Sequence, residues 1–585
     1  MSWVEESLKQ KVKDSALKHA LINALEHDGK ALAKSVLGKI ISENKDLRNF
    51  IREVKSLVDE VVEEVNKLKV EEQKRVLEKL GIQMPSKPKA EKREALPPLP
   101  NVDRYEKVVT RFSPNPDCVL HLGSARAIIL SHEYARMYGG KFILRFEDTD
   151  PRLKRSALKF YDYIREDLIW LGCKWDEEYI QSDRIPIYYE HAEKLINLGK
   201  AYVCTCERED FRRLVNSKTP CPCRGLSPHE NLDRWNSMLN GEYKEGEAVL
   251  RIKTDIEHPN PAVRDWPALR IIDVEKYPHP RVGRKYRVWP LYNFACGIDD
   301  HLMGVTHIIR GKEHLTNQIR QMYLYEHLGW KYPETIHYGR LKLSNAVLSK
   351  SKIVEGVRSG LYTGWSDPRL ATLIALRRRG IQPEAIRRMI LEVGPKPVDV
   401  TLSWENLYAY NRKIVDPQAD RYFFVEDPRK LVVHGLPHAF YVEIPLHPQH
   451  SERGSRRFHV EPKDGVVELW VSGSDLELIK AKGKVRLIGL FNVEVKEDRE
   501  RLNGRFLHES YERAKKEGIP LIHWIPCDGA FPTRVIMPDA REKRGLAEES
   551  CRRLKADMVV QFERFGFVRV DEVKDSLLTV FYAHR

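Results

Sequence analysis

The first 84 residues place apolar side chains at helical spacing. Near the start these positions lie four residues apart, with charged and polar residues between them: Val4, Leu8, Val12, Ala16 and Ala20. Residues 54–80 repeat the pattern with dense glutamate and lysine and without glycine or proline. Apolar residues at this spacing form one face of a helix. We therefore expect an N-terminal helical domain over residues 1–84, either an appendage that binds a partner or RNA, or a helical cap that only adds solubility.

A proline-rich segment follows the helical region. Residues 85–100 read PSKPKAEKREALPPLP and combine five prolines with many charges. Proline fixes an extended backbone and keeps the preceding residue out of the helical conformation. The segment predicts a linker over residues 85–104, with a new domain beginning near residue 105.

From residue 105 the pattern changes to strand, loop, helix and strand. Residues 107–112 and 141–148 are short β-like runs, and residues 125–139 between them have a helical pattern. A second helical pattern covers residues 154–171. This order is a βαβ unit, which implies a parallel sheet with its ligand site at the C-terminal ends of the strands.

The α/β pattern is interrupted and then resumes. Residues 201–285 are irregular and rich in cysteine, whereas residues 286–345 again show strand and helix signals. We therefore expect an α/β domain that is split by an insertion. Beyond about residue 415, short strands alternate with turn residues, for example at 484–495, 520–526 and 559–570. Such a pattern predicts β-barrels.

Composition and charge add two expectations. The 585 residues carry 99 lysines and arginines against 85 aspartates and glutamates, a net charge of +14. Basic groups bind polyanions by releasing counterions, so nucleic acid is a candidate partner, although a solvated basic surface is an equal alternative. The chain has no uncharged apolar run of about 18 residues and no apolar segment at its start. We therefore expect no membrane partner, no secretory signal and a cytoplasmic protein.

Four of the nine cysteines are clustered. Cys204 and Cys206 form one C-x-C pair, and Cys221 and Cys223 form another. Four thiolates suit tetrahedral Zn²⁺, although the pairs are tighter than the usual C-x₂-C spacing, so reduced thiols without metal are the alternative. We expect a structural Zn²⁺ site without a catalytic role, because four protein ligands would close the coordination sphere.

Two short segments carry candidate phosphate chemistry. The first lies in the turn after the strand at 107–112 and contains His121, Gly123 and Ser124. Glycine allows close approach of a ligand, the following helix N-terminus favours phosphate, and histidine can donate a hydrogen bond. The second, LSKSK at 348–352, offers hydroxyls and lysines on a loop, which suits a phosphate clamp. Each is weak alone, because an ordinary histidine at a helix start and a polar surface loop would look the same.

Together the two segments resemble the signatures of class I aminoacyl-tRNA synthetases, known as HIGH and KMSKS. Three further stretches resemble the glutamyl/glutaminyl subgroup: RFSPNP before His121, RFEDTDP at 145–151 and MGVTHIIRGKEH at 303–314. The resemblance covers roughly residues 103–585 and leaves the N-terminal helices outside. The strand-rich C-terminal third resembles the double β-barrel of glutaminyl enzymes, a combination similar to archaeal glutamyl-tRNA synthetases.

The resemblance implies a multidomain fold, α/β plus β. Its catalytic domain is of Rossmann type, in two halves at 105–200 and 286–345, separated by an acceptor-stem-binding insertion at 201–285. Residues 346–414 would carry the KMSKS loop and contact the tRNA stem. Residues 415–585 would form the double β-barrel that binds the anticodon.

The resemblance also implies a glutamate–tRNA ligase. Such an enzyme uses ATP with Mg²⁺ to form glutamyl-adenylate and transfers glutamate to the 3′ end of tRNA-Glu. Archaeal relatives often charge tRNA-Gln with glutamate as well, and the family default is a monomer. Two alternatives remain open: a glutaminyl-tRNA synthetase, which the barrels favour, and a catalytically silent tRNA-binding protein.

The resemblance assigns roles to the residues at matching positions. His121, Ser349 and Lys350 are the expected catalytic residues. The expected ATP-binding residues lie in the two signatures and in the turn before the first: Pro114, Asn115, Pro116, His121, Gly123, Ser124, Leu348, Ser349 and Lys350. Ser124 replaces the last histidine of HIGH, and Val347 replaces the first lysine of KMSKS. These two positions are therefore doubtful as catalytic groups.

Four residues match positions that bind the amino acid in this subgroup. Glu147 is expected to receive the α-amino group, and Arg111 and Tyr292 are expected to line the pocket. Arg310 decides the amino acid, because glutamyl enzymes carry arginine at this position and glutaminyl enzymes an uncharged residue.

The chemistry of arginine agrees with that choice. Its guanidinium pairs with a carboxylate in two-point fashion, whereas a neutral amide would leave the buried charge without a partner. The alternative for Arg310 is a structural salt bridge to Asp299 or Glu313.

Overall fold

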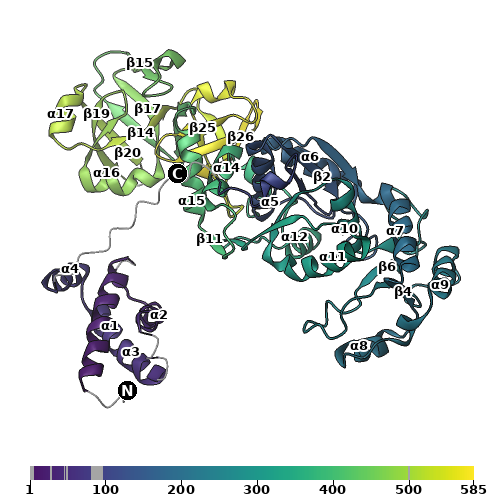
Figure 1. Ribbon diagram of the computed structural model, residues 1–585. Helices are drawn as coiled ribbons and strands as arrows, with labels where there is room; N and C mark the ends of the chain where they lie inside the picture. Colours follow the sequence, from purple (N-terminus) through teal and green to yellow (C-terminus); the bar gives the residue numbers. More distant parts are fainter. Residues whose placement is uncertain (1–5, 27–28, 45–46, 48–49, 81–95, 499–500) are drawn as a thin grey trace. The chain divides into compact units, whose positions relative to one another are not determined.

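The computed structural model describes residues 6–26, 29–44, 47, 50–80, 96–498 and 501–585 (Figure 1). The chain divides into two compact units, Met1–Arg93 and Glu94–Arg585. The predicted linker lies outside the described residues as far as residue 95, and Val102–Arg104 forms a short 3-10 turn. Among the described helices, none has both the length and the apolar character that a membrane crossing requires.

The described part of the N-terminal unit is helical, as its apolar spacing predicts. Its helices are α1 (Glu6–Glu26), α2 (Ala33–Glu43), α3 (Ile51–Lys67) and α4 (Val70–Lys79). Five valines on the buried face of α3 recur three and four residues apart: Val54, Val58, Val61, Val62 and Val65. They share a core with Val12 and Ala16 of α1. Residues 54–80 belong to two helices, α3 and α4. The second begins after Lys69, whose backbone N–H donates a hydrogen bond to the carboxylate of Glu72.

The α/β part of the second unit begins with the predicted βαβ unit. β1 (Val109–Phe112), α5 (Leu122–Met137) and β2 (Lys141–Phe146) are arranged with the two strands parallel. After helix α6 (Leu158–Trp170), β3 (Glu177–Ile180) adds to the sheet beside β2. All residues of β1 are buried, which is typical of a parallel strand with both faces covered.

The second half of this domain forms a two-stranded parallel sheet, and its strand β8 lies beside β1. Helix α10 (Tyr292–Leu302) leads into β8 (His307–Gly311). This strand pairs in parallel with β9 (Glu334–Tyr338), and α11 (Leu315–Leu328) connects the two strands in the chain. Thr306 exchanges hydrogen bonds with Val109 of β1, 197 residues earlier in the chain. The predicted fold class, a Rossmann-type domain interrupted by an insertion, is therefore confirmed.

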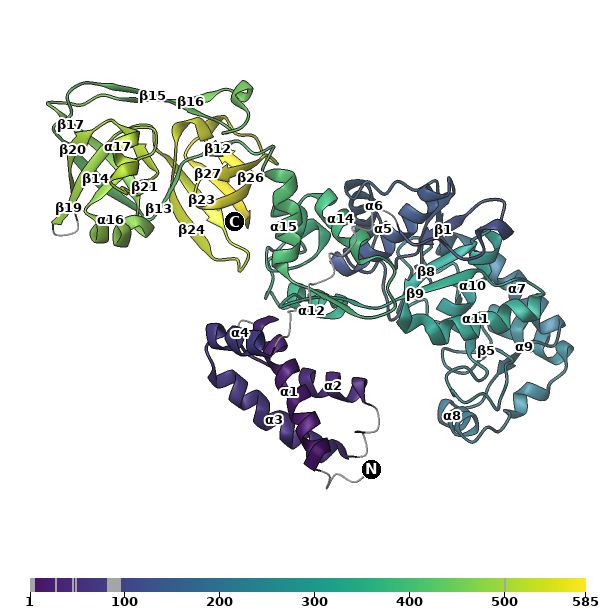
Figure 2. The ribbon, with the colours of Figure 1, turned by 60° about the vertical axis from the view of Figure 1, so that its left-hand side comes forward.

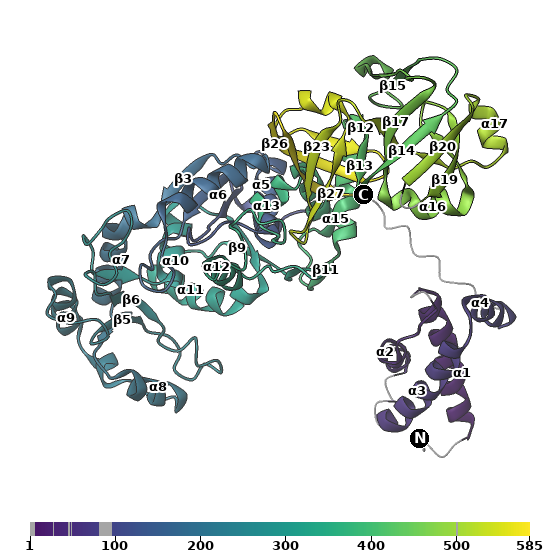
Figure 3. The same cartoon turned by 180° about the vertical axis from the view of Figure 1, so that it is seen from behind.

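The insertion is more regular than its sequence predicts. The expectation of an irregular segment is wrong, because four short strands form an antiparallel sheet in the order β4-β5-β6-β7, beside helix α7 (Figure 3). The elements are α7 (Ile185–Asn197), β4 (Ala201–Cys204), α8 (Arg208–Asn216), α9 (Pro228–Asn240), β5 (Val249–Ile252), β6 (Pro267–Ile271) and β7 (Val288–Pro290). Each strand is too short to show alternation and depends on its partners. Helix α9 does carry a readable signal, since Ser227 and Glu230 form a capping box.

A two-stranded sheet and four helices connect the catalytic sheet to the C-terminal part. They are β10 (Leu341–Leu343), α12 (Lys350–Arg358), α13 (Leu373–Arg378), α14 (Pro383–Val393), β11 (Val400–Leu402) and α15 (Trp404–Val415). α14 packs against both α5 and α15. Arg378 of α13 forms an ion pair with Asp571 at 3.0 Å, which ties this region to the last strands.

The C-terminal part consists of two seven-stranded, barrel-like sheets. Their orders are β21-β18-β19-β20-β14-β17-β22 and β12-β25-β26-β27-β23-β24-β13. The strands are β12 (Arg421–Tyr422), β13 (Phe424–Glu426), β14 (Pro428–His434), β15 (Phe440–Pro445), β16 (Ser455–Val460), β17 (Val466–Ser472), β18 (Lys484–Leu487), β19 (Asn492–Asp498), β20 (Arg501–His508), β21 (Leu521–Ile522), β22 (Trp524–Pro526), β23 (Phe531–Ile536), β24 (Glu542–Ala547), β25 (Val559–Phe562), β26 (Gly566–Lys574) and β27 (Leu577–His584). The hairpin of β15 and β16 lies over both sheets (Figure 2).

The three strand-like stretches that sequence reasoning selected in this region each contain two strands. Residues 484–495 hold β18 and the start of β19, joined by a turn in which Gly489 has a φ of 75°. Residues 520–526 and 559–570 are divided in the same way. The β-rich prediction is therefore confirmed, and the strands are shorter than the apolar runs.

Candidate active site

A cavity of about 520 Å³ lies at the C-terminal ends of β1, β2 and β8. Residues 111–115 line it from the end of β1, Glu147 and Asp150 from the segment after β2, and Arg310 from the end of β8. Lys350, the first residue of α12, lines it as well. This is the edge of a parallel sheet at which a ligand site is expected.

Most of the residues predicted for ATP and glutamate line this cavity. They are Arg111, Pro114, Asn115, Ser124, Glu147, Tyr292, Arg310 and Lys350. The cavity lining does not include Pro116, His121, Gly123, Leu348 and Ser349. All of these except Leu348 are direct neighbours in the chain of a lining residue, whereas Leu348 packs against the hydrophobic core of the catalytic part.

The first signature is held at the start of α5 by backbone contacts. The Leu122 N–H donates to the Ala371 carbonyl at 2.9 Å, and His121 is the N-cap of the helix. The buried Nδ1 of His121 has no hydrogen-bond partner among the described residues. Burial and the positive charge of Lys350 lower the pKa of His121 to about 4. The ring is therefore neutral at pH 7, and its buried Nδ1 is unpaired among the described residues.

Gly123 is needed for the position of the histidine ring. A Cβ atom at this position would lie 2.9 Å from Cε1 of His121, which is closer than real Cβ contacts. Any other residue would therefore displace the ring. Ser124, at the position of the last HIGH histidine, lines the cavity with a hydroxyl that can form hydrogen bonds without carrying charge.

The second signature differs from its prediction in one respect. We expected a loop over residues 348–352, but Lys350 begins helix α12, with Ser349 as its N-cap. The segment after Ser349 lacks proline and carries the buried Ile353, so it can form a helix with one face in the core. The hydroxyls of Ser349 and Ser351 lie 3.0 Å apart and are exposed. Ser349 therefore belongs to the surface beside the cavity.

The two signatures meet at Lys350. Its ammonium group lies 2.9 Å from Oδ1 of Asp117 and 3.4 Å from the carbonyl oxygen of Asn115. Both partners belong to the turn before His121. The fold thus brings together an aspartate and a lysine that are 233 residues apart in the chain. Asp117 is a site residue that sequence reasoning missed.

Arg111 and Glu147 each contact an oppositely charged residue at the cavity. Arg111 donates to Asp300 from Nε at 3.0 Å and from Nη2 at 3.2 Å. Glu147 accepts a hydrogen bond from Nη2 of Arg145 at 2.9 Å, and burial raises the pKa of Glu147. Arg111 and Glu147 thus reach the cavity with fixed orientations.

Arg310 has neutral partners. It is 4% exposed and donates to Oε1 of Gln321 at 3.1 Å and to the hydroxyl of Tyr332 at 2.8 Å. The salt bridge that was the alternative reading is not formed, because Asp299 and Glu313 pair with other arginines. Within the described part of the chain, no carboxylate lies at ion-pair distance from this guanidinium. A buried guanidinium at a cavity wall with neutral partners can receive an external carboxylate.

Sequence reasoning missed several other residues of this site. Arg145, Asp300 and His314 contact the predicted residues, and Lys154 lines the cavity. The Tyr292 hydroxyl lies 3.5 Å from Nδ1 of His314. Arg145 and His314 lie in the stretches 145–151 and 303–314 that resemble the subgroup, but nothing in the sequence gives them a role, and Asp300 and Lys154 lie outside the quoted stretches. Their burial and their contacts, which arise only in the folded chain, identify them.

The four clustered cysteines converge at one point of the insertion. Their sulfur atoms all lie within 4.8 Å of one another, between the end of β4 and the short 3-10 turn Pro222–Gly225. The sulfur of Cys221 lies 3.6 Å from that of Cys204 and 3.2 Å from that of Cys206, and the Cys206–Cys223 distance is 3.9 Å. Tetrahedral Zn²⁺ with Zn–S bonds of about 2.3 Å sets its ligands about 3.8 Å apart. The donor set and its spacing therefore fit one such ion.

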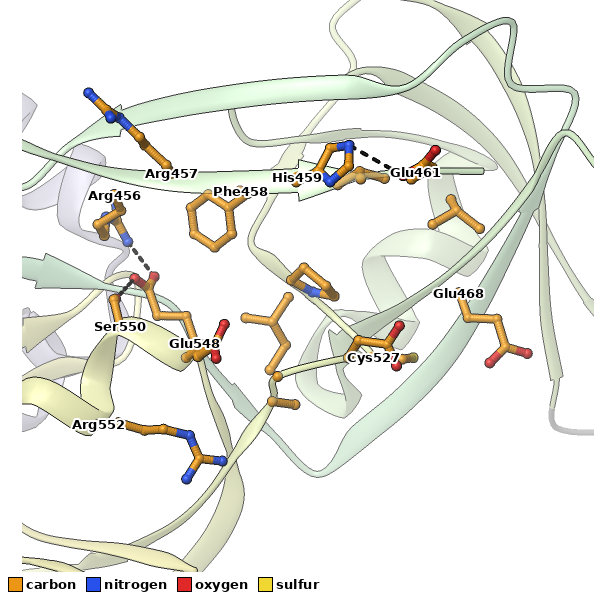
Figure 4. Close-up of a pocket in the computed structure, with 18 of the residues that line it drawn as sticks. Arg456, Arg457, Phe458, His459, Glu461, Glu468, Cys527, Glu548, Ser550 and Arg552 are labelled. Atoms are coloured by element: carbon orange, nitrogen blue, oxygen red, sulfur yellow. Dashed lines mark hydrogen bonds and ion pairs between the residues drawn. The ribbon is translucent and has the colours of Figure 1, made fainter. Parts of the chain in front are cut away.

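A second cavity, of about 1220 Å³, lies among the C-terminal strands (Figure 4). Residues of β16, of β17 and of the segments after β22 and β24 line it, so both sheets contribute. Arg456 is buried at its wall and bridges Glu548 and Glu563 at 2.7 and 2.8 Å. Arg457 and Arg552 also line the cavity. It offers cationic and hydrogen-bonding groups to a polar or anionic ligand.

Models of known protein families match most of the second unit. The model described as tRNA synthetases class I (E and Q), catalytic domain, matches residues 107–417, which is more than half of the chain. Two models described as the anti-codon binding domain of the same synthetases match residues 419–512 and 521–571.

Curated relatives match along nearly the whole chain. A Pyrococcus furiosus protein named glutamate–tRNA ligase is 54% identical over 98% of this chain and 100% of its own length. The proteins of the same name from Pyrococcus horikoshii and Methanothermobacter thermautotrophicus are 55% and 48% identical, each over 98% of this chain and 100% of their own length. The chain therefore belongs to the class I tRNA synthetases of the E and Q type, the glutamyl/glutaminyl subgroup.

Proposed function

We propose that this synthetase is a glutamate–tRNA ligase that uses ATP to attach glutamate to the 3′ end of tRNA-Glu. The observation that carries the choice of amino acid is Arg310, a buried guanidinium at the cavity wall with neutral partners. The relatives that match the full chain bear the same name. The proposal joins these two independent lines of support.

The reaction has two steps. An oxygen of the glutamate α-carboxylate attacks the α-phosphorus of ATP, and the bond to the β-phosphate breaks, which yields glutamyl-adenylate and pyrophosphate. A hydroxyl of the terminal tRNA ribose then attacks the activated carbonyl, and AMP leaves. The protein contributes position and charge balance, as is usual for transfer at phosphorus.

The amino-acid end of the cavity holds glutamate through three charged groups. Arg310 and Arg111 receive its carboxylates, and Glu147 receives its α-amino group. Tyr292 borders the same space. Glutamine would leave the guanidinium of Arg310 buried without a counter-charge, at a cost of some kcal/mol. The pocket therefore favours glutamate.

The nucleotide end uses the two signatures. The neutral ring of His121 donates a hydrogen bond to a phosphoryl oxygen, and Lys350 supplies positive charge. Ser349 and Leu348 shape the approach from the second signature. Pro114, Asn115 and Ser124 line the nucleotide end, and Pro116 and Gly123 are adjacent to them in the chain. Mg²⁺ accompanies the phosphates of ATP as their counter-ion.

The cysteine cluster holds a structural Zn²⁺ ion. Cys204, Cys206, Cys221 and Cys223 supply four sulfur ligands at distances that suit a closed tetrahedral site. The ion links the end of β4 to the turn at Pro222–Gly225. Its contribution is to the stability of the insertion, and no reaction step depends on it.

Transfer RNA is the macromolecular partner. The insertion takes the acceptor stem, and the barrel-like sheets, with the cavity of Figure 4, take the anticodon. The net charge of +14 supports a polyanionic partner. The active form is proposed to be a monomer, the default that the family resemblance implies.

Charging of separate transcripts of tRNA-Glu and tRNA-Gln with labelled glutamate and labelled glutamine tests this function. We expect glutamate on tRNA-Glu, and glutamate on tRNA-Gln as well would make the enzyme non-discriminating. Incorporation of glutamine would favour a glutaminyl-tRNA synthetase. The absence of charging, with tRNA binding intact, would favour a silent tRNA-binding protein, an alternative that Ser124 at the position of the last HIGH histidine keeps open.

A further inference from the structure

Four charged residues, three of them buried and Glu147 slightly exposed, form a continuous chain of contacts at the amino-acid end of the cavity. The order is Arg111, Asp300, Arg145 and Glu147, and each contacts the next. Arg145 is 0% exposed, and the Asp300 side chain is 2% exposed. Arg111 and Glu147 at the two ends line the cavity, whereas Asp300 and Arg145 lie behind it.

The two inner residues each bridge two partners. Asp300 accepts two hydrogen bonds from Arg111, at 3.0 and 3.2 Å, and one from Nη1 of Arg145 at 2.7 Å. Arg145 uses its other terminal nitrogen, Nη2, to donate to Glu147 at 2.9 Å. Cys296 lies beside Arg145, with its sulfur 3.2 Å from Nη2 of the arginine. The separation of Arg111 and Glu147 is therefore fixed by Asp300 and Arg145.

The charges of this chain of contacts balance one another. Two guanidinium groups face two carboxylates, and Arg310 adds one further positive charge at the cavity wall. Burial raises the pKa of Asp300, but the positive charges of Arg111 and Arg145 lower it more. The pKa of Asp300 is therefore well below its ordinary value, and Asp300 is ionised. Glutamate carries two carboxylates and one ammonium group, so its single net negative charge matches the excess.

We propose that Asp300 is a positioning residue that adapts the site to glutamate, by orienting Arg111 directly and Glu147 through Arg145. The proposal rests on the function proposed above and deepens it. Without the Asp300 carboxylate, Arg111 loses its two-point anchor, and Arg145 is free to neutralise Glu147. Glutamate then meets a misdirected guanidinium and a weakened partner for its α-amino group. The nucleotide end, which Lys350 and His121 form, keeps its contacts.

The adjacent residue Asp299 provides a matched control. It lies on the same helix, is 0% exposed, and accepts from Gln181 at 3.0 Å, from Arg184 at 2.8 Å and from Tyr188 at 2.7 Å. It makes no contact with Arg111 or Arg145 among the hydrogen bonds and ion pairs of the described residues. Asp299→Asn and Asp300→Asn therefore each remove one buried carboxylate from α10, and only the second disturbs the proposed positioning.

The experiment compares the full-length wild type with the two variants. Steady-state charging of tRNA-Glu gives KM for glutamate and for ATP, and calorimetric titration with glutamate gives its Kd. We expect Asp300→Asn to raise the KM and Kd for glutamate roughly 30-fold or more, the usual effect of breaking one partner of a buried charge pair. The KM for ATP should stay within about threefold. Asp299→Asn should lower the thermal unfolding midpoint without changing either glutamate constant.

A second variant keeps the proposal testable if Asp300→Asn does not fold. Arg145→Lys retains the positive charge, but a single ammonium group cannot bridge Asp300 and Glu147 in the same geometry. We expect a rise in the KM for glutamate of roughly tenfold, again without a change for ATP. Equal effects of Asp299→Asn and Asp300→Asn on glutamate, or constants within threefold of wild type for Asp300→Asn and Arg145→Lys, would overturn the proposal.

Glutamate binding and tRNA charging together distinguish a failure of the ligase function from a failure of the positioning role of Asp300. If wild type binds glutamate but charges no tRNA with it, the ligase function fails, while the calorimetric constants of the variants still decide the role of Asp300. If wild type charges tRNA with glutamate and Asp300→Asn is unaffected, the ligase function stands and the positioning role fails. If wild type neither binds nor charges glutamate, both are overturned.

Discussion

The ammonium group of Lys350 lies 2.9 Å from the carboxylate of Asp117, and this ion pair joins the two signatures of the synthetase fold. The lysine comes from the first turn of α12 and the aspartate from the turn before α5. The pair is partly buried, with side chains 34% and 23% exposed, so solvent screens it only in part. A phosphate group carries more negative charge than one carboxylate and can therefore replace Asp117 as the partner of Lys350.

Replacing Lys350 should slow adenylate formation and leave properties that do not involve ATP largely unchanged. Lys350→Met keeps the length of the side chain and removes its charge. We expect the rate of ATP–pyrophosphate exchange, with tRNA present, to fall roughly 100-fold or more, because charge stabilisation at a transferring phosphoryl group is lost. Lys352→Met, two residues later on the exposed surface of the same helix, is the control. Similar rates for the two variants would argue against a role of Lys350 in the reaction.

The sequence predicts the elements around the signatures well, because they depend on local pattern. The βαβ unit from Val109 to Phe146 follows from two apolar runs and one helical run. This unit needs only neighbouring residues, which a sequence displays directly. The two C-x-C pairs are also visible in the sequence, but their convergence depends on the fold, because the short sulfur contacts join one pair to the other.

The site could be predicted only in part, because its contacts join distant residues. Asp300 is 189 residues from Arg111 and 155 from Arg145 in the chain, and Asp117 is 233 from Lys350. No local pattern connects such partners. The helical start at Lys350 differs from the expected loop because hydroxyls and lysines over residues 348–352 indicate a polar loop, whereas Ser349 before a proline-free segment is an N-cap signal.

The neutral state of His121 predicts a pH effect on stability. The pKa of His121 in the folded chain is lowered from 6.5 to about 4 by burial and by Lys350. The unfolded chain therefore binds a proton at a higher pH than the folded chain does. The stability that neutral His121 contributes is complete above about pH 6.5 and is lost as the pH falls towards 4.

His121→Asn removes this titration and keeps a polar side chain. Scanning calorimetry of wild type and variant at about pH 7.5 and about pH 5 measures the effect. We expect acidification to lower the unfolding temperature of the wild type more than that of the variant. A difference between the two proteins that is the same at both pH values would show that folding does not shift the pKa of His121.

The cysteine cluster predicts one Zn²⁺ ion per chain. Cys221→Ser should abolish the bound metal and lower the unfolding temperature of the insertion, because binding energy of a structural ion contributes to folding. Cys527→Ser, outside the cluster and partly exposed, should leave both unchanged. Metal content by mass spectrometry and calorimetry are the measurements. A wild-type protein purified with Zn²⁺ present that carries no metal would rule out the site.

The choice of glutamate by Arg310 is tested most directly by the ratio of kcat/KM for glutamate to kcat/KM for glutamine on tRNA-Glu. We expect a large ratio for wild type and for Arg340→Gln, whose side chain is 62% exposed. In Arg310→Gln the efficiency with glutamate should fall roughly 100-fold or more, so that the ratio collapses, because the γ-carboxylate loses its counter-charge. Retention of the wild-type ratio by Arg310→Gln would contradict the assignment of this arginine and the choice of substrate that rests on it.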